Sequence, residues 1–192
     1  MSSMIKLAAK ELRITKPLEK DIKAIKKNPI YIILDNVLDT YNIGAVFRLA
    51  DALAVEKVIL CGQTETPPNS RIKKASINTT EWVSWQYADS AAIAISNLKS
   101  HPSLSGSKIQ VVAIEQDKRS IPYTKANYQF PLALVIGHET SGVSPEALEL
   151  VDQIVELPMW GVNISLNVMV SLGIVLYEVM HRKEQGSVIA NG

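Results

Sequence analysis

The chain has 192 residues, of which 47% are hydrophobic and 20% charged, and this composition favours one globular domain over a disordered or fibrous protein. The formal net charge is +1 and Cys61 is the single cysteine, so an intrachain disulfide is excluded and a cysteine-built metal site is not expected. The chain lacks a signal-peptide pattern at its start, and its longest apolar stretch, residues 168–177, is too short to span a bilayer, so we expect a cytoplasmic protein that binds neither a membrane nor a metal.

A basic segment opens the chain. Residues 1–30 hold eight Lys or Arg against three Asp or Glu, a charge of +5, whereas the remaining chain has a charge of −4. Apolar residues recur at partial helical spacing within residues 3–27, and Pro17 divides them because proline interrupts a helix. We therefore predict that residues 1–28 form a basic helical arm, which suits either a polyanionic partner or solvated, lysine-rich helices.

After this arm, predicted strands alternate with predicted helices. Short apolar runs predict strands, and longer stretches with apolar residues at helical spacing predict helices. The predicted strands are residues 30–34, 57–61, 109–114, 131–136 and 153–157. The predicted helices are residues 42–53, 88–98, 144–150 and 164 to about 182, and residues 62–78 are predicted to form a long loop. This alternation is typical of an α/β domain with a mostly parallel sheet.

The loops that follow the predicted strands carry the candidate sites, because ligands of open α/β sheets bind beyond the carboxyl ends of the strands. The first of these loops leads into Asn42, Gly44 and Arg48. We expect Asn42 to cap the helix and Gly44 to allow the close approach of another chain segment or a ligand. Arg48 lies on an otherwise apolar helix, where a buried arginine needs either a structural salt bridge or a bound phosphate or carbonyl group.

Two further loops follow later strands. Residues 137–143 hold two glycines where main-chain amides can meet a ligand, but they match neither a Walker A loop nor a serine-hydrolase elbow. Glu139 in this loop is either a solvated charge or a group that orients an arginine or a substrate. Residues 157–168 pass from a strand into a helix, and we expect Ser165 and Asn167 in its first turn, where they either cap the helix or bind an electron-rich group.

Together the three loops resemble the signature motifs of SpoU-type (TrmH-like) RNA methyltransferases of the SPOUT superfamily. In chain order they match N-x-G-x-x-x-R, G-x-E-x-x-G-[VIL] and [IVL]-P-M-x-G-x-x-x-S-L-N-V. The resemblance implies an S-adenosylmethionine-dependent enzyme that methylates a ribose 2′-hydroxyl in tRNA or rRNA, with tRNA favoured by the small size of the chain. It also implies a parallel-sheet α/β fold with a C-terminal trefoil knot over residues 29–183, and a homodimer formed through the knot region. We expect residues 184–192 to be a flexible tail.

The resemblance also assigns roles to individual residues. The residues that it places in the S-adenosylmethionine pocket are Ile114, Glu115, Gly137, Leu157, Met159, Ser165 and Leu166. The implied catalytic arginine is Arg48, and the residues that position it, the ribose or the loops are Asn42, Glu139, Ser165 and Asn167. An arginine is a poor proton acceptor, so we favour a role in which Arg48 holds the adjacent phosphate and aligns the hydroxyl over one in which it takes the proton.

RNA binding is expected outside these motifs. Arg71, Lys73 and Lys74, together with the basic arm, are predicted to grip the RNA backbone in a sequence-independent and salt-sensitive manner. Residues 75–80 read Ala-Ser-Ile-Asn-Thr-Thr where many members of the resembled family have a glycine-containing stretch, which leaves the shape of this loop open. The alternative function is a non-catalytic RNA-binding protein that retains the fold. A nucleotide-binding enzyme of another class is disfavoured, because phosphate-loop signatures are missing.

Overall fold

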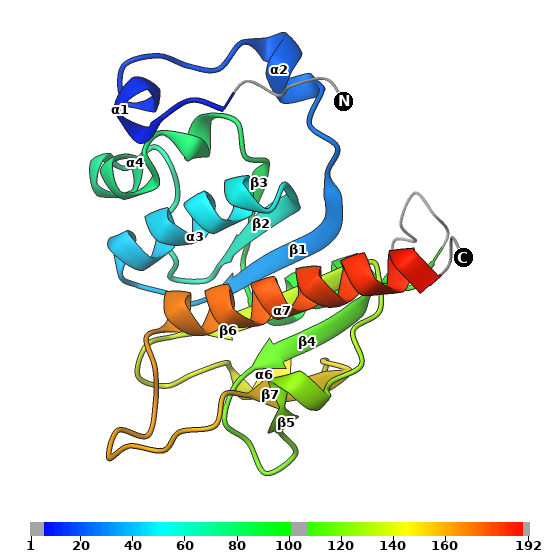
Figure 1. Ribbon diagram of the computed structural model, residues 1–192. Helices are drawn as coiled ribbons and strands as arrows, with labels where there is room; N and C mark the ends of the chain where they lie inside the picture. Colours follow the sequence, from blue (N-terminus) through cyan, green and yellow to red (C-terminus); the bar gives the residue numbers. More distant parts are fainter. Residues whose placement is uncertain (1–5, 101–106, 190–192) are drawn as a thin grey trace.

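Short apolar segments form one parallel sheet at the centre of the protein. The computed structural model describes residues 6–100 and 107–189, apart from the side chains after Gly186. In this part of the chain the strands are β1 (Asn28–Asp35), β2 (Val55–Cys61), β3 (Trp85–Ala88), β4 (Gln110–Ile114), β5 (Ile121–Pro122), β6 (Leu132–Gly137) and β7 (Gln153–Glu156). They pair in the order β3-β2-β1-β6-β4-β7-β5, and every pair is parallel (Figure 1).

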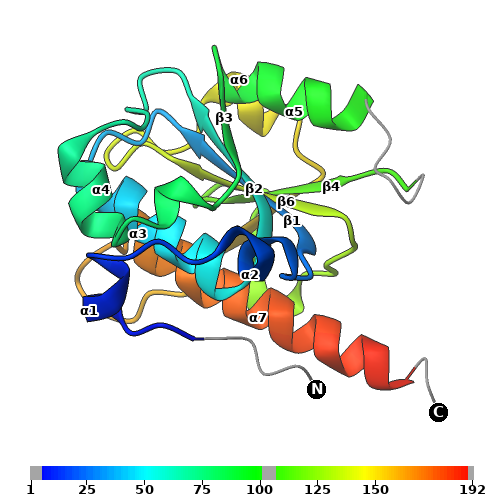
Figure 2. The same ribbon diagram turned by 90° about the horizontal axis from the view of Figure 1, so that it is seen from above.

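Helices cover both faces of this sheet. The described helices are α1 (Ala9–Leu12), α2 (Glu19–Lys23), α3 (Thr40–Ala52), α4 (Ser70–Ser76), α5 (Ala91–Ser100), α6 (Pro145–Leu148) and α7 (Val168–Ile189), with 3₁₀ turns η1 (Thr79–Glu81) and η2 (Tyr123–Lys125). Helices α3, α4 and α7 pack on one face, and α5 and α6 pack on the other (Figure 2). Because both faces are covered, the central strands are continuous apolar runs rather than alternating ones.

Strand β1 shows how the core is divided. Ile32 and Leu34 are fully buried beneath α3 and α7, whereas Ile33 is fully buried on the side of α5 and α6. Successive side chains of a strand point to opposite faces, so one strand contributes to both halves of the core. The predicted α/β domain with a parallel sheet is therefore confirmed, and the trefoil knot stays a prediction.

Helix α4 and the strands β3 and β5 were not predicted from the sequence, and each is short. Residues 62–78 were predicted to be a loop, but they contain α4, which Asn69 caps by accepting hydrogen bonds from the main-chain N–H groups of Arg71 (2.8 Å) and Ile72 (3.1 Å). Strand β3 lies at the edge of the sheet, beside β2, and is only four residues long. None of these three elements is long enough to show a clear hydrophobic period.

The last helix was predicted with wrong ends. Helix α7 begins at Val168 rather than near Ile164, and it continues to Ile189 rather than ending near Arg182. Asn167 fixes the start, since its Oδ1 accepts hydrogen bonds from the main-chain N–H groups of residues 169 and 170 at 2.9 and 3.3 Å. The first residues of the expected flexible tail are thus helical, and residues 190–192 lie outside the described residues.

The N-terminal arm forms two short helices, α1 and α2, on either side of Pro17, as predicted. It lies against the segment around α4 and η1, where the Asn78 side chain donates a 2.8 Å hydrogen bond to the carbonyl of Leu12 (Figure 1). Lys16 lies 3.9 Å from Glu81 of η1. Residues 1–5 of the predicted arm lie outside the described residues, and the boundary at residue 28 stays a prediction.

None of the described helices has the length and apolar character needed to cross a membrane.

Gly44 brings α3 and α4 into contact. A Cβ atom at this position would lie 2.5 Å from the Cβ of Ala75 and 2.9 Å from the carbonyl oxygen of Ile72. The segment that approaches Gly44 is therefore a neighbouring helix rather than a ligand.

Replacing Gly44 by alanine is expected to lower the free energy of unfolding by about 1–3 kcal/mol, because overpacking outweighs a helix-propensity gain of about 1 kcal/mol. Denaturant unfolding measures the change. Gly173→Ala in α7 is the matched control, because a Cβ there would meet its nearest atom, Leu49 Cδ1, at an ordinary 3.6 Å. We expect the control to be neutral or slightly stabilising, and equal destabilisation by both variants would contradict the packing argument.

Candidate active site

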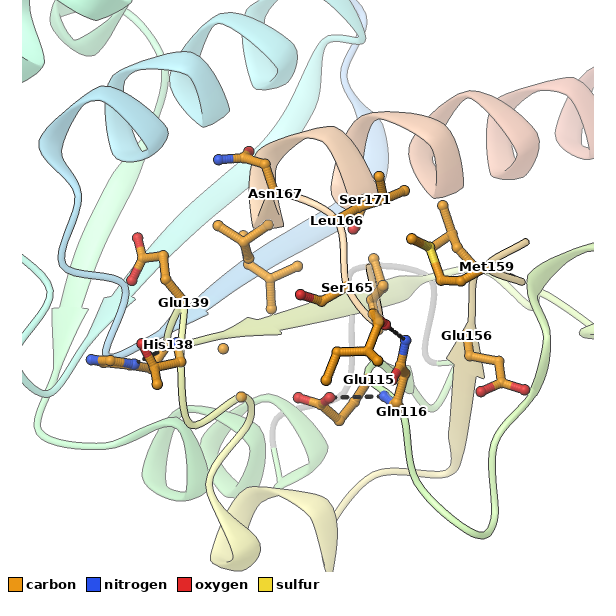
Figure 3. Close-up of a pocket in the computed structure, with 18 of the residues that line it drawn as sticks. Glu115, Gln116, His138, Glu139, Glu156, Met159, Ser165, Leu166, Asn167 and Ser171 are labelled. Atoms are coloured by element: carbon orange, nitrogen blue, oxygen red, sulfur yellow. Dashed lines mark hydrogen bonds between the residues drawn. The ribbon is translucent and has the colours of Figure 1, made fainter. Parts of the chain in front are cut away.

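A cavity of about 560 Å³ opens where β4, β6 and β7 end and the segment before α7 folds over them (Figure 3). Parallel strands present their carboxyl ends at one edge of a sheet, which is where α/β proteins bind ligands. The structure places all seven residues of the predicted pocket in its lining: Ile114, Glu115, Gly137, Leu157, Met159, Ser165 and Leu166. Of the residues predicted to be catalytic, Glu139, Ser165 and Asn167 also line it.

One wall of this cavity is a tight turn that requires glycine at both ends. His138 and Gly142 pair through main-chain hydrogen bonds of 3.0 and 2.9 Å. A Cβ atom on Gly137 would lie 2.1 Å from the carbonyl carbon of Gly142. Gly142 has φ +71°, and a Cβ atom there would lie 2.1 Å from Oε2 of Glu115. Glycine therefore lets the chain close on itself here and leaves room for the cavity.

Two carboxylates hold this wall in place. Oε2 of Glu115 accepts a 2.8 Å hydrogen bond from the main-chain N–H of Val143. Asp35, which is 1% exposed at the end of β1, accepts hydrogen bonds from the N–H (2.8 Å) and the hydroxyl (2.6 Å) of Ser144. Ser144 occupies the N-cap position of α6, but its hydroxyl donates to Asp35 rather than capping the helix. Glu115 thus has a structural role in addition to lining the cavity.

Cys61 lies beside Asp35 in the core and does not take part in the site. Burial, and secondarily the charge of Asp35, raises the pKa of the Cys61 thiol to about 12. The thiol therefore stays protonated at neutral pH, and Cys61 acts as a small core residue.

A chain of hydrogen bonds joins the cavity to α3 and α7. Oε1 of Glu139 accepts from Nδ2 of Asn42 at 3.0 Å, and Oδ1 of Asn42 accepts from Nδ2 of Asn167 at 3.0 Å. Glu139 also accepts from the main-chain N–H groups of Leu38 (3.2 Å) and Asp39 (3.1 Å). The loop at Glu139, the first turn of α3 and the start of α7 are far apart in the sequence. These side chains fix them to one another at the edge of the cavity.

Asn42 was expected to cap α3, and this expectation is wrong. Asp39 is the cap, because its carboxylate accepts a 2.8 Å hydrogen bond from the N–H of Tyr41. Asn42 instead lies within the first turn, only 6% exposed, between Glu139 and Asn167. A nearby aspartate can serve as the cap, which leaves the buried asparagine free to link the two loops.

Glu139 is held as an anion. Burial raises its pKa, but hydrogen bonds from Asn42 and from main-chain N–H groups, including those of Asp39 and Leu38, outweigh this effect and lower the pKa below its ordinary value. The carboxylate is therefore ionised at neutral pH with its acceptor positions in use, so Glu139 organises the loop before α3 rather than accepting a proton.

Arg48 is neither buried nor paired with any residue in the described part of the chain. It is exposed on α3, and it forms no hydrogen bond or ion pair with any residue that the structure describes. The structural salt bridge that the sequence left open is thus absent among the described residues. Arg48 does not line the cavity, but it lies on the helix whose first turn Asn42 ties to the cavity.

Ser165 is placed differently from the prediction. It lies exposed in the segment before α7, not in the first helical turn, and Asn167 rather than Ser165 is the cap. The described segment between β7 and α7 is also stabilised by Gln116, whose side-chain amide donates to the carbonyl of Ile164. Gln116 was not singled out from the sequence, although it directly follows Glu115 at a strand end.

His138 has a local role in the turn. Its Nδ1 accepts hydrogen bonds from the main-chain N–H groups of Thr140 (2.9 Å) and Ser141 (3.2 Å), so it shapes the turn while lining the cavity. No pattern in the sequence signals this contact. The other lining residues not predicted are Ile136, Thr140, Gly142, Glu156, Asn163, Ile164, Val168 and Ser171.

The three predicted RNA-binding residues lie on α4, outside the cavity. All three are exposed, and Lys73 also forms a 3.0 Å ion pair with Glu81. Helix α4 packs against α3, so these cations lie on the same face of the sheet as Arg48.

The turn after α4 forms without glycine. Ile77 (φ +53°) and Asn78 (φ +65°) both adopt left-handed backbone conformations. Asparagine tolerates this conformation, but a β-branched residue seldom adopts it. Burial of the Ile77 side chain, which is 8% exposed, offsets the unfavourable conformation.

Comparisons with known proteins agree with this arrangement. The model of the SpoU rRNA Methylase family matches residues 29–177. A tRNA (guanosine(18)-2′-O)-methyltransferase of Aquifex aeolicus is 30% identical over 180 residues, covering 88% of this chain and 79% of that protein. A 23S rRNA (guanosine-2′-O-)-methyltransferase of Acinetobacter baylyi is 29% identical over 168 residues, covering 86% of this chain and 66% of that protein.

Solved structures show the same fold. The crystal structure of the TrmH/SpoU tRNA modifying enzyme of A. aeolicus has a TM-score of 0.75 at 27% identity, covering 93% of this chain and 84% of that chain. An AdoMet-bound rRNA methyltransferase from Sinorhizobium meliloti has a TM-score of 0.72 at 25% identity, covering 89% of this chain and 60% of that chain. The family model matches well over half of the sequence, and the protein therefore belongs to the SpoU rRNA Methylase family.

Proposed function

We propose that the protein is an S-adenosylmethionine-dependent methyltransferase that methylates a ribose 2′-hydroxyl in tRNA or rRNA. The observation that carries this proposal is the cavity at the ends of β4, β6 and β7. Residues of the second motif (137–143) and of the third motif (157–168) line it. Asn42 of the first motif is hydrogen-bonded to Glu139 and Asn167, one residue from each of the other two. The two similar proteins from A. aeolicus and A. baylyi are named as RNA 2′-O-methyltransferases.

The cavity suits S-adenosylmethionine in size and chemistry. Small-molecule sites measure about 300–1,000 Å³ and combine apolar walls with a few polar groups. Here Ile114, Ile136 and Leu157 supply apolar surface, and the carboxylates of Glu115 and Glu156 supply negative charge. Negative charge suits a ligand with a sulfonium and an ammonium group. When bound, this cofactor supplies a methyl group on a positively charged sulfur.

The residues of the chain then act by positioning. Arg48 is free to hold an RNA phosphate beside the target ribose, which aligns the 2′-hydroxyl and stabilises charge as it attacks. Asn42 and Glu139 fix the helix that carries Arg48 relative to the cavity. Asn167 fixes the start of α7 in the same network.

The RNA backbone is proposed to bind across α4 and the arm. Arg71 and Lys74 are available for phosphates, whereas Lys73 contributes less because Glu81 already partly neutralises it. An enzyme that modifies tRNA or rRNA is expected in the cytoplasm, where these substrates are found.

The direct test incubates the purified protein with radiolabelled S-adenosylmethionine and with unmodified total tRNA or rRNA, and then maps 2′-O-methyl groups. We expect label at a ribose 2′-oxygen, with tRNA the better substrate. Binding of S-adenosylmethionine without transfer to either RNA would favour a non-catalytic relative that retains the fold. Absence of cofactor binding would overturn the proposal.

We also propose that two copies of the chain associate through α7 and the segment before it. Apolar side chains are exposed along this surface, and contiguous apolar surface of this kind marks an interface. They are Trp160, Val162, Ile164, Leu166, Val170, Ile174 and Tyr177. The resemblance to SpoU-type enzymes implies the same region.

Ile174→Asp is expected to convert a dimer into a monomer, because a carboxylate would be buried against apolar groups at the interface. Light scattering after gel filtration measures the mass. Ile93→Asp is the matched control, because Ile93 is similarly exposed on α5 (46%, against 37% for Ile174) on the opposite face of the sheet. A monomeric wild-type protein, or equal effects of both variants, would contradict this interface.

A further inference from the structure

Helix α3 carries an aromatic side chain on the same face as Arg48. Tyr41 precedes Arg48 by seven residues, which is two helical turns and about 10 Å along the helix axis. Tyr41 is 59% exposed, and its hydroxyl forms no hydrogen bond with any residue that the structure describes. Ala45 lies between them on this face; it is half-buried, and its side chain is a single methyl group.

The backbone around Tyr41 is rigidly tied to the cavity. The N–H of Tyr41 donates to Asp39 at 2.8 Å, and Glu139 holds the N–H groups of Leu38 and Asp39. The next residue, Asn42, is bonded to Glu139 and to Asn167, both of which line the cavity. Tyr41 therefore projects from a fixed point at the edge of the cavity, although it is not part of any motif discussed above.

The charge around this face indicates the kind of ligand it suits. On this face of α3, Tyr41, Arg48 and Ala52 are exposed and Ala45 is half-buried, and none of the four side chains carries a carboxylate. The neighbouring helix α4 adds the exposed cations Arg71 and Lys74. An aromatic ring near cations that have no partner among residues 6–100 and 107–189 matches a nucleotide, which offers a base to stack and a phosphate to pair. A second copy of this chain would fit this face less well, because it would have to present acidic groups to these cations.

We propose that Tyr41 is the platform on which the base of the methylated nucleotide stacks while Arg48 holds an adjacent phosphate. The inference rests on the proposed RNA methyltransferase function. Stacking the base on Tyr41 and pairing the phosphate with Arg48 fixes the nucleotide at two points, so that the ribose between them is presented at the cavity. Because stacking tolerates any base, Tyr41 favours an unpaired nucleotide over a paired one without selecting its identity.

Steady-state kinetics with unmodified total tRNA tests this inference. Tyr41→Ala is expected to raise KM for RNA about 10-fold or more, while KM for S-adenosylmethionine stays unchanged. Tyr41→Phe keeps the ring and should behave like the wild type. Tyr87→Ala is the matched control, since Tyr87 is also half exposed (49%) but lies on β3.

Binding of short oligoribonucleotides isolates the base. Wild-type protein should bind a hexamer of adenylate more tightly than an abasic ribose-phosphate hexamer of equal charge, and Tyr41→Ala should remove that difference. If the wild type methylates RNA but Tyr41→Ala is unaltered in both assays, this inference fails while the proposed function stands. If Tyr41→Ala changes only the oligomeric mass in light scattering, Tyr41 belongs to an interface between copies and the inference is overturned. If the wild type transfers no methyl group to RNA, the proposed function itself fails.

Discussion

Replacing Arg48 by alanine is expected to lower kcat for RNA methylation by about 10²–10³-fold, because the phosphate beside the reacting ribose loses its anchor and the developing charge loses a partner. The same change should leave the free energy of unfolding within about 0.5 kcal/mol, since Arg48 is exposed and has no partner among the described residues. Binding of S-adenosylmethionine should also be unchanged, since Arg48 does not line the cavity. Radiolabel transfer, thermal unfolding and calorimetry measure the three quantities.

Arg71→Ala provides the contrast for this experiment. It removes an exposed arginine from α4, so it should raise KM for RNA and reduce the salt dependence of binding while leaving kcat near the wild-type value. Arg48→Lys keeps the charge but not the planar fork, and partial activity is expected. Full activity of Arg48→Ala would contradict the assigned role of this residue.

Replacing Gly137 by alanine is expected to weaken S-adenosylmethionine binding about 100-fold, a loss of about 3 kcal/mol. The new Cβ atom would lie 2.1 Å from the carbonyl carbon of Gly142 and 2.2 Å from the N of Val143. Both contacts are with the main chain, so the turn must open, and the pairing of His138 with Gly142 is lost with it. Calorimetric titration with S-adenosylmethionine measures the affinity, and denaturant unfolding reports the accompanying loss of stability.

Gly161→Ala is the matched control, because it changes another glycine of the same three motifs. A Cβ atom on Gly161 would have no atom within 4 Å, so neither affinity nor stability should change appreciably. Should Gly137→Ala remain folded and bind S-adenosylmethionine normally, the cavity formed by this turn would not be the cofactor site.

The position of the cavity could be predicted because it lies where buried strands end, whereas its individual residues were assigned by the resemblance to SpoU-type enzymes. Ile114, Gly137 and Leu157 come at or next to the ends of buried apolar runs, and parallel strands bring such ends to one edge. Because these residues come at the carboxyl ends of parallel strands, the sequence alone indicates that they lie at the same edge of the sheet. The motif resemblance then identified which of these loops belong together.

The side-chain network could not be predicted, since its members lie about a hundred residues apart. Asn42 is an acceptable helix cap by its residue type, but Asp39 takes that place and Asn42 bonds to Glu139 and Asn167 instead. Ser165 is likewise an acceptable cap, but Asn167 has that role in the structure. Several residues with equal local capping ability compete, and only the tertiary packing decides among them.

The central position of β6 has a consequence for how the chain is made. Strand β1 pairs with β2 soon after it in the sequence, but its other edge pairs with β6, where Leu34 lies opposite Ile136. During synthesis from the N-terminus, the apolar edge of β1 therefore stays open until residues 132–137 have left the ribosome. Such unpaired edges invite aggregation, and distant strand pairing slows folding. The nascent chain is thus most vulnerable to misassembly over the interval in which its first half is complete and its central strand has not yet emerged.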